Sequence, residues 1–73
     1  MQSNAMNNTM QIKGHTALIS VDPDTAQFRG EFTGLNGGAE FYGASVKSLH
    51  KEGARSLMTF LDVCKERGIA PYR

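Results

Sequence analysis

Cysteine, histidine, proline and tryptophan are scarce in this 73-residue chain, which has one cysteine, two histidines, two prolines and no tryptophan. The single Cys64 excludes a disulfide within the chain, and His15, His50 and Cys64 lack the spacing of zinc ligands. No apolar run approaches the roughly 20 residues that a membrane helix needs. The usual devices that stabilise a very small domain are therefore missing, and we expect a partner chain to supply the support.

The first nine residues differ in character from the rest. Residues 1–5 resemble a tag remnant ahead of a second start at Met6, and the following residues are polar and Asn-rich. We therefore interpret residues 1–9 as a tag remnant and disordered lead-in, and residues 10–73 as a single domain. A domain of about 60 residues buries only about 60% of the surface that its unfolded chain exposes. We expect a cytoplasmic homo-oligomer, a dimer or larger, with no membrane association and no cofactor.

Three segments alternate in the manner of half-buried strands, and they cover residues 11–21, 27–33 and 39–42. Gly14 lies in the first, where we interpret it as a bulge or bend within one long strand. The run Asp22-Pro23-Asp24-Thr25 has the composition of a tight turn, and the glycines of residues 34–38 indicate a flexible connection. The sequence therefore predicts a three-stranded antiparallel sheet.

One amphipathic helix is predicted after the strands, from Ser45 to Arg67. Ser45 fits the N-cap, and Gly68 fits the position that ends the helix, with Pro71 preventing its resumption. Ser48 stands where a capping box has an acidic residue, so we expect no capping box. The tail after Gly68 is the one segment with the character of a linker. The apolar stripe of the helix consists of Val46, Leu49, Gly53, Leu57, Phe60, Leu61 and Cys64.

Helix and sheet together predict an α+β domain of order β-β-β-α, with the helix packed on the apolar face of the sheet. A glycine inside a helix costs about 1 kcal/mol relative to alanine. At Gly53 we therefore expect either a close approach of the sheet or the ring of Phe41 in the space. The predicted core consists of Ala17, Ile19, Val21, Phe28, Phe32, Phe41, Leu49, Leu57, Phe60, Leu61 and Cys64.

The order and spacing of several short pieces resemble the HicB family, the antitoxin half of HicA/HicB toxin–antitoxin pairs. The resemblance runs from about Ile12 to Pro71. The matching pieces are Ile12-Lys13-Gly14 with Ala17, Phe28-x-Gly30-Glu31 with Gly34-Leu35, Phe41-x-Gly43-x-Ser45-Val46 with Leu49, and Phe60-Leu61-x-x-Cys64 followed by Gly68 and Pro71.

This resemblance implies a partial RNase H-like fold and a bacterial protein that works by binding. Its partner would be a HicA-like toxin that cleaves messenger RNA, and the protein would form dimers or larger assemblies. Many family members continue into a C-terminal DNA-binding segment, for which the sequence up to Arg73 shows no counterpart. The resemblance therefore implies toxin binding or self-association rather than repression.

Catalysis is an alternative to protein binding, and the sequence favours it less. An RNase H-like nuclease would need clustered carboxylates for metal ions, yet Asp22 and Asp24 lie in the predicted turn, and Glu31 and Glu40 lie on the wet face of the predicted sheet. The two histidines have no nucleophile or carboxylate at a telling spacing, and Cys64 belongs to the apolar stripe. We expect no enzyme activity, no catalytic residues and no metal site.

Nucleic-acid binding is the second alternative. Residues 1–44 hold two basic and four acidic side chains, whereas residues 45–73 hold six and three. Lys47, Lys51 and Arg55 form a basic row along the exposed helix face, which would be the contact surface for RNA or DNA. A solvated stripe is the commoner reason for such a row, and the net charge of +1 favours protein partners.

Overall fold

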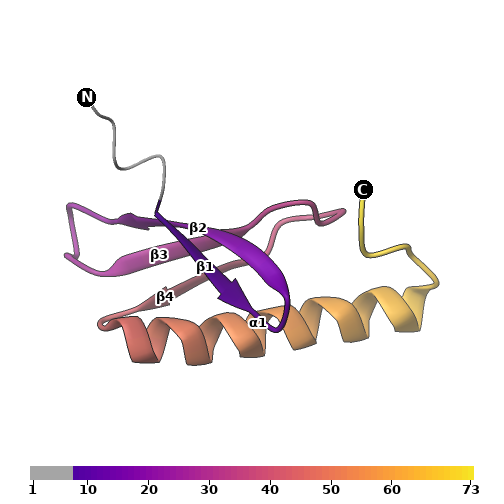
Figure 1. Cartoon of the computed structure of the whole chain (residues 1–73). Coiled ribbons are helices and arrows are strands. Elements are labelled where there is room, and N and C mark those ends of the chain that lie inside the picture. The colour runs from indigo at the N-terminus through magenta and orange to yellow at the C-terminus, as the bar shows by residue number, and fades with distance from the viewer. Residues whose placement is uncertain (1–7) are drawn as a thin grey trace.

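The strands form one antiparallel sheet in which each strand pairs with the next along the chain, and a single helix crosses one face of that sheet (Figure 1). The computed structural model describes residues 8–73. The α+β class and the C-terminal helix agree with the sequence prediction, but the sheet has four strands within these residues rather than three. The elements are β1 (Thr9–Ile12), β2 (His15–Val21), β3 (Phe28–Phe32), β4 (Glu40–Gly43) and α1 (Val46–Arg67).

The predicted first strand is in fact a hairpin of two strands. Ile12 pairs with His15, and the two residues between them, Lys13 and Gly14, have φ values of 50° and 80°. Two successive positive φ values are typical of a type I′ turn, the mirror image of the type I turn. This turn suits the right-handed twist of the two strands of a hairpin. Gly14 adopts such an angle without strain, so it reverses the chain instead of bending one strand.

The N-terminal boundary also differs from the sequence interpretation. Residues 1–7 of the predicted lead-in lie outside the described residues. Thr9 opens β1, and the Asn8 carbonyl accepts a hydrogen bond of 2.8 Å from the backbone N–H of Ile19. Asn8 and Thr9 therefore belong to the folded part.

The reversal between β2 and β3 follows the predicted turn chemistry. An Asp22 carboxylate oxygen accepts a hydrogen bond of 2.9 Å from the Asp24 backbone N–H, and the Ala26 N–H donates to the Asp22 carbonyl. A side chain that bonds its own backbone two residues on mimics a backbone turn. The turn brings Val21 opposite Phe28 and sets the register of the β2–β3 pair.

Helix α1 begins at a capping box that the sequence prediction missed. The Ser45 side chain accepts a hydrogen bond from the Ser48 backbone N–H, and the Ser48 hydroxyl accepts one from the Ser45 N–H at 3.1 Å. A serine hydroxyl thus takes the place of the usual Glu or Gln side chain. Gly68 ends the helix in the left-handed conformation.

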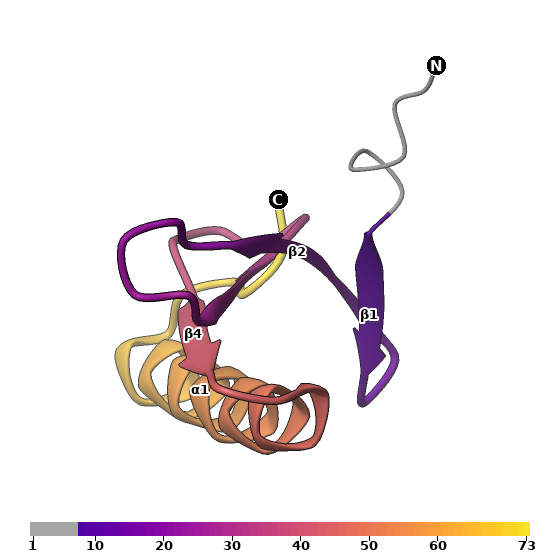
Figure 2. The same ribbon diagram turned by 90° about the vertical axis from the view of Figure 1, so that its left-hand side faces the viewer.

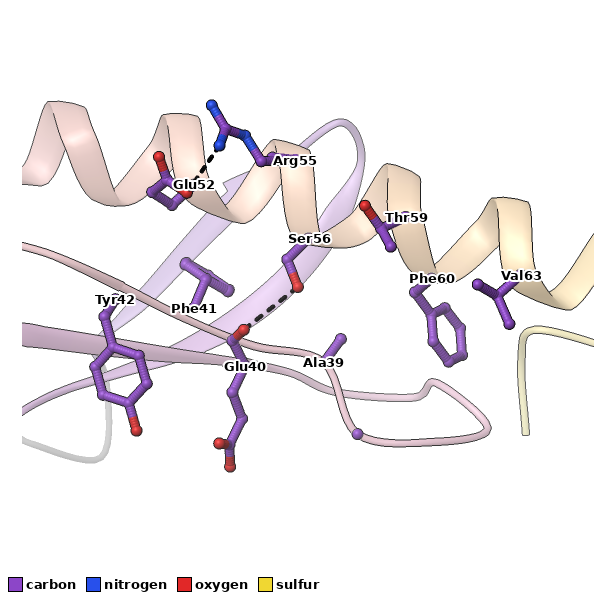
Figure 3. A pocket seen from close by; sticks show the side chains of 11 residues that line it. Ala39, Glu40, Phe41, Tyr42, Glu52, Arg55, Ser56, Thr59, Phe60 and Val63 are labelled. Carbon is purple, nitrogen blue, oxygen red and sulfur yellow. Dashed lines mark hydrogen bonds and ion pairs between the residues drawn. The ribbon is translucent and has the colours of Figure 1, made fainter.

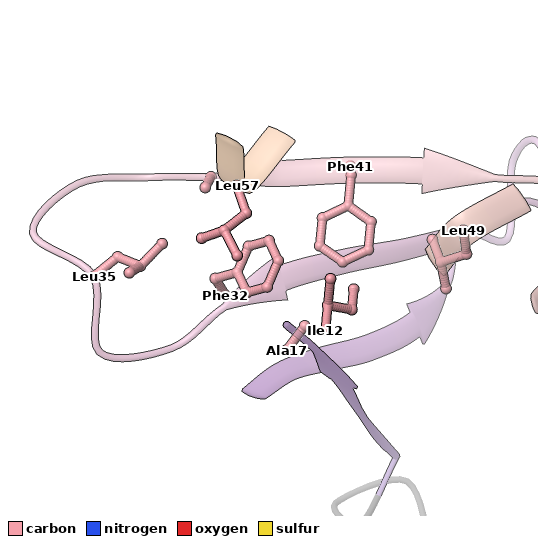
Figure 4. Packing of buried hydrophobic residues seen from close by; sticks show 8 residues of the cluster. Ile12, Ala17, Phe32, Leu35, Phe41, Leu49 and Leu57 are labelled. Atoms are coloured by element: carbon pink, nitrogen blue, oxygen red, sulfur yellow. The ribbon is translucent and has the colours of Figure 1, made fainter. Parts of the chain in front are cut away.

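The core lies between α1 and the apolar face of the sheet (Figure 4). Phe32 and Phe41 pack with their ring centroids 5.1 Å apart. Three buried hydrophobic residues, Ile12, Leu35 and Ala39, were not on the predicted list. Of the predicted residues, Ala17, Phe32, Phe41, Leu49, Leu57 and Cys64 are buried, and Ile19, Phe28, Phe60 and Leu61 are partly buried.

Val21 corrects the predicted core, because 59% of its surface is exposed. A groove of about 370 Å³ lies between the sheet and the start of the helix, and Val21 and Val46 help to line it. Val46 is also exposed, although it belongs to the apolar stripe. Period-two alternation assigns Val21 to the correct face but does not show how far the helix covers that face.

The tail after α1 docks onto the loop between β3 and β4, so it is not a free linker. Leu35 and Tyr72 form an antiparallel bridge, in which the Asn36 N–H donates to the Pro71 carbonyl at 2.7 Å and the Arg73 N–H to the Gly34 carbonyl at 3.1 Å. The Tyr72 ring stacks on His15, with ring centroids 5.6 Å apart. This contact joins the C-terminal end to the start of β2.

Candidate functional site

Strand β4 forms one edge of the sheet, because within residues 8–73 its strand partner is β3 alone. The Phe32 N–H donates to the Ala39 carbonyl, which fixes the alternation of the ladder. Phe41 and Gly43 then turn their backbone groups toward β3, whereas Glu40 and Tyr42 turn theirs outward. The edge therefore presents backbone donors and acceptors to another strand.

A groove of about 470 Å³, the edge groove, runs beside this strand, between β4 and one flank of α1 (Figure 3). Its apolar part comes from Ala39, Phe41, Phe60 and Val63. The Ser56 hydroxyl donates a hydrogen bond of 3.3 Å to the Glu40 carbonyl and so ties the helix to the edge strand. The groove thus combines an open backbone with an apolar lining, which suits an extended peptide.

The helix side of the edge groove carries one charge of each sign. Arg55 lies 3.9 Å from Glu52, and the two belong to adjacent turns of α1. Both side chains remain substantially exposed, so this ion pair adds little stability. Its consequence for binding is that this flank has no net charge.

The outer face of the sheet holds an ionic cluster around Arg29. Its guanidinium contacts the Glu31 carboxylate at 3.5 Å and forms an ion pair with Glu40. Hydrogen bonding to Tyr42 and to Glu40, together with the charges of Glu40 and Glu31, raises the pKa of the Arg29 guanidinium above its ordinary value. Arg29 therefore remains charged and separates two carboxylates that face each other across β3 and β4.

The basic row predicted as a nucleic-acid contact lies along α1. Lys47, Lys51 and Arg55 are all exposed. Arg55 also pairs with Glu52 and lines the edge groove, so its guanidinium is shared with an acidic neighbour. The structure therefore brings the row together without making it a purely basic surface.

The remaining candidates for chemistry stay apart. Asp22 and Asp24 bond within their turn, and Glu31 and Glu40 both pair with Arg29. Within residues 8–73, no three His, Cys, Asp or Glu side chains gather as a metal-binding group.

The histidines and the cysteine are also separate from one another. The two ring nitrogens of His15 lie 3.0 Å from the Lys13 carbonyl and from the Tyr72 hydroxyl. His50 is exposed on α1, and Cys64 is buried as a free thiol.

The edge groove was not predicted from the sequence, although several of its residues lie in predicted elements. Ser56, Thr59 and Val63 are spaced along one flank of a helix, next to the core stripe. The sequence feature that could have predicted these groove residues is the short strand β4, which is followed directly by the helix that packs on it.

Comparison with known protein families, with curated proteins and with solved structures found no significant match to this chain. In the described part of the chain, no helix combines the length and the apolar character that a membrane crossing needs. The open edge of β4 and the edge groove beside it are therefore the features that bear on function.

Proposed function

We propose that this chain is a non-catalytic protein-binding module of the antitoxin type, which accepts an extended strand of a partner along β4. The observation that carries the proposal is the open edge of β4 beside the edge groove. An added strand satisfies the outward backbone groups of Glu40 and Tyr42, while its side chains enter the groove. Main-chain hydrogen bonds provide affinity, and contacts with Phe60 and Val63 provide selectivity.

The resemblance to HicB antitoxins suggests the identity of the partner. A HicA-like toxin that cleaves messenger RNA is the proposed target, and self-association is the other mode of binding that the resemblance implies. A helix that follows the strands is part of the order that the resemblance implies and supports the proposal, although the sheet described here has four strands where β-β-β-α has three. In this proposal, binding blocks the toxin and requires no reaction by the chain itself.

A substitution to proline tests the edge directly. Tyr42→Pro removes an outward N–H from β4 without removing a hydrogen bond to β3. We expect it to reduce, at least tenfold, the affinity for a recombinant HicA-like toxin in calorimetry, and to restore cleavage of labelled messenger RNA by that toxin. Tyr42→Ala keeps the N–H, so comparison of the two variants separates the backbone from the ring.

The opposite edge of the sheet provides the matched control. The hydrogen bond between Asn8 and Ile19 fixes the β1 ladder so that Thr9 turns its N–H outward. Thr9→Pro should therefore fold and bind as the unmodified chain does. Toxin binding that is equally strong in Tyr42→Pro, or absent from the unmodified chain, contradicts the proposal.

The basic row remains the basis of the nucleic-acid alternative, because Lys47 and Lys51 are exposed on α1. A filter-binding titration with double-stranded RNA and DNA at moderate salt tests it. Under the protein-binding proposal, the chain and its Lys47→Ala/Lys51→Ala/Arg55→Ala variant bind equally weakly. Micromolar binding that the triple variant loses supports the alternative instead.

A further inference from the structure

We propose that a second copy of this chain occupies the β4 edge, in an antiparallel pair that places Glu40 opposite the second copy's Tyr42. This inference rests on the proposed protein-binding function and takes self-association as the mode in which the edge is used, so a toxin strand would compete with the second copy for the same backbone groups. The two sheets then continue through the interface as one. A two-fold axis passes beside Phe41, and both copies use the same surface.

The backbone groups of β4 fix this register. Only Glu40 and Tyr42 within β4 turn their N–H and carbonyl groups outward, as the ladder with β3 dictates. Pairing Glu40 of each copy with Tyr42 of the other uses these groups on both strands. The Glu40 carbonyl can accept from the added strand as well as from the Ser56 hydroxyl, because a carbonyl oxygen has two lone pairs.

Charge on the outer face favours a second copy over an unrelated strand. Glu31 and Glu40 lie opposite each other, an unfavourable pair of like charges that Arg29 separates from one side. In the proposed register, the row of Glu31 and Glu40 continues into the second copy's Tyr42 and then its Arg29. In each copy, the Glu31–Glu40 pair therefore lies next to the Tyr42 hydroxyl and the Arg29 guanidinium of the other copy.

The position of α1 adds the helix flank to the contact. The helix lies beneath β4 and packs mainly against it, with smaller contacts to β3 and β1 (Figure 2). A two-fold axis beside β4 sets the two helices antiparallel, so that the flank of Glu52, Arg55, Thr59 and Val63 faces the same flank of the second copy in the reverse direction. This flank carries one acidic and one basic side chain, so it meets its copy without net repulsion.

The area that a stable dimer buries is large enough that the helix flank must take part in the contact as well as β4. A specific interface buries roughly 800 Å² on each partner, which is more than a four-residue strand provides. Val63 has 40% of its surface exposed, and pairing across the edge groove would cover it. The proposal therefore expects substitutions on α1, as well as on β4, to weaken the dimer.

Cysteine cross-linking tests the register. On a Cys64→Ala background, a tagged Glu40→Cys chain is mixed with an untagged Tyr42→Cys chain under mild oxidation. Directly opposed residues of a hydrogen-bonded pair have Cα atoms about 5.5 Å apart, within the range that a disulfide bridges. We expect a mixed covalent dimer on a non-reducing gel, whereas each variant alone stays mostly monomeric on the gel.

Matched variants on the other edge, Thr9→Cys mixed with Gln11→Cys, should not cross-link. Light scattering of the unmodified chain should give the mass of a dimer at micromolar concentration, and Tyr42→Pro and Val63→Asp should give a monomer with an unchanged circular dichroism spectrum. A monomeric unmodified chain overturns the inference, as does cross-linking of Glu40→Cys or Tyr42→Cys only with itself.

These outcomes separate the inference from the broader function. A monomer that binds a HicA-like toxin through β4 leaves the proposed function in place and removes the second copy. A dimer with the expected cross-link that binds no toxin keeps the second copy and removes the antitoxin role.

Discussion

Gly53 of α1 and Phe41 of β4 are in such close contact that the helix has no room there for a side chain. A Cβ on Gly53 would lie 2.8 Å from the Phe41 ring and closer still to Cδ1 of Ile12. The sequence suggested either a close approach of the sheet or the Phe41 ring in this space, and the structure shows both. The glycine therefore lets β1 and β4 pack closely on one turn of the helix.

Gly53→Ala should destabilise the chain even though alanine is the better helix former. Alanine gains about 1 kcal/mol of helix propensity. Overpacking of a filled core costs typically 1–3 kcal/mol, and both neighbours here belong to the core. We expect a net loss of about 1 kcal/mol in the free energy of unfolding, measured by urea denaturation.

Gly38→Ala is the matched control for that experiment. A Cβ at Gly38 meets no atom within 4 Å, so we expect a change of less than about 0.5 kcal/mol. A Gly53→Ala variant more stable than the unmodified chain would show that Phe41 and Ile12 move aside easily.

Leu57→Ala and Val21→Ala should differ sharply, although the sequence assigns both residues to the core. Leu57 is buried within the main cluster, and its truncation should cost about 2–5 kcal/mol. Val21 is exposed, so its truncation should cost less than about 0.5 kcal/mol. Thermal unfolding of both variants checks the order, and similar losses would contradict the packing described here.

Ser48→Ala should weaken the start of α1. Its hydroxyl accepts from the Ser45 N–H and donates to the Ser45 carbonyl, both at 3.1 Å. Loss of a cap of this kind costs about 0.5–1 kcal/mol. Urea denaturation measures the loss, and Ser48→Gln, whose side chain can restore the capping box, should recover part of it. No recovery would show that the serine acts through its packing instead.

Tyr72 and His15 should be energetically coupled, which would show that the tail is docked in solution. The rings stack with an interplanar angle of 17°, and the Tyr72 hydroxyl lies 3.0 Å from Nε2 of His15. A double-mutant cycle with His15→Ala and Tyr72→Ala should give a coupling of about 0.5–1.5 kcal/mol. Additive losses would mean that the tail does not hold this position.

Local patterns account for much of the fold. The alternation of residues 27–33 predicted β3, and Ser45 with Gly68 predicted both ends of α1. The turn after β2 follows from Asp22 and Pro23. These features depend on contacts between residues close in the chain, which composition and spacing report directly.

The hairpin at Lys13 and Gly14 was missed for a local reason as well. A lysine before the glycine is not the Asn or Asp that usually marks this turn. The prediction therefore joined two strands into one, and Ile12, which ends β1, was left out of the predicted core.

The amino-acid sequence by itself determined the α+β class of this protein, the residues at which its helix begins and ends, and, through its single cysteine, the exclusion of a disulfide within the chain. Tertiary structure alone decided that β4 is an edge, that α1 lies beneath it, that the edge groove opens between them, and that Val21 is exposed. The physical reason is distance along the chain. Helix caps and turns are settled within a few residues, whereas the place of a strand in a sheet and the cover of a face depend on residues far apart in sequence.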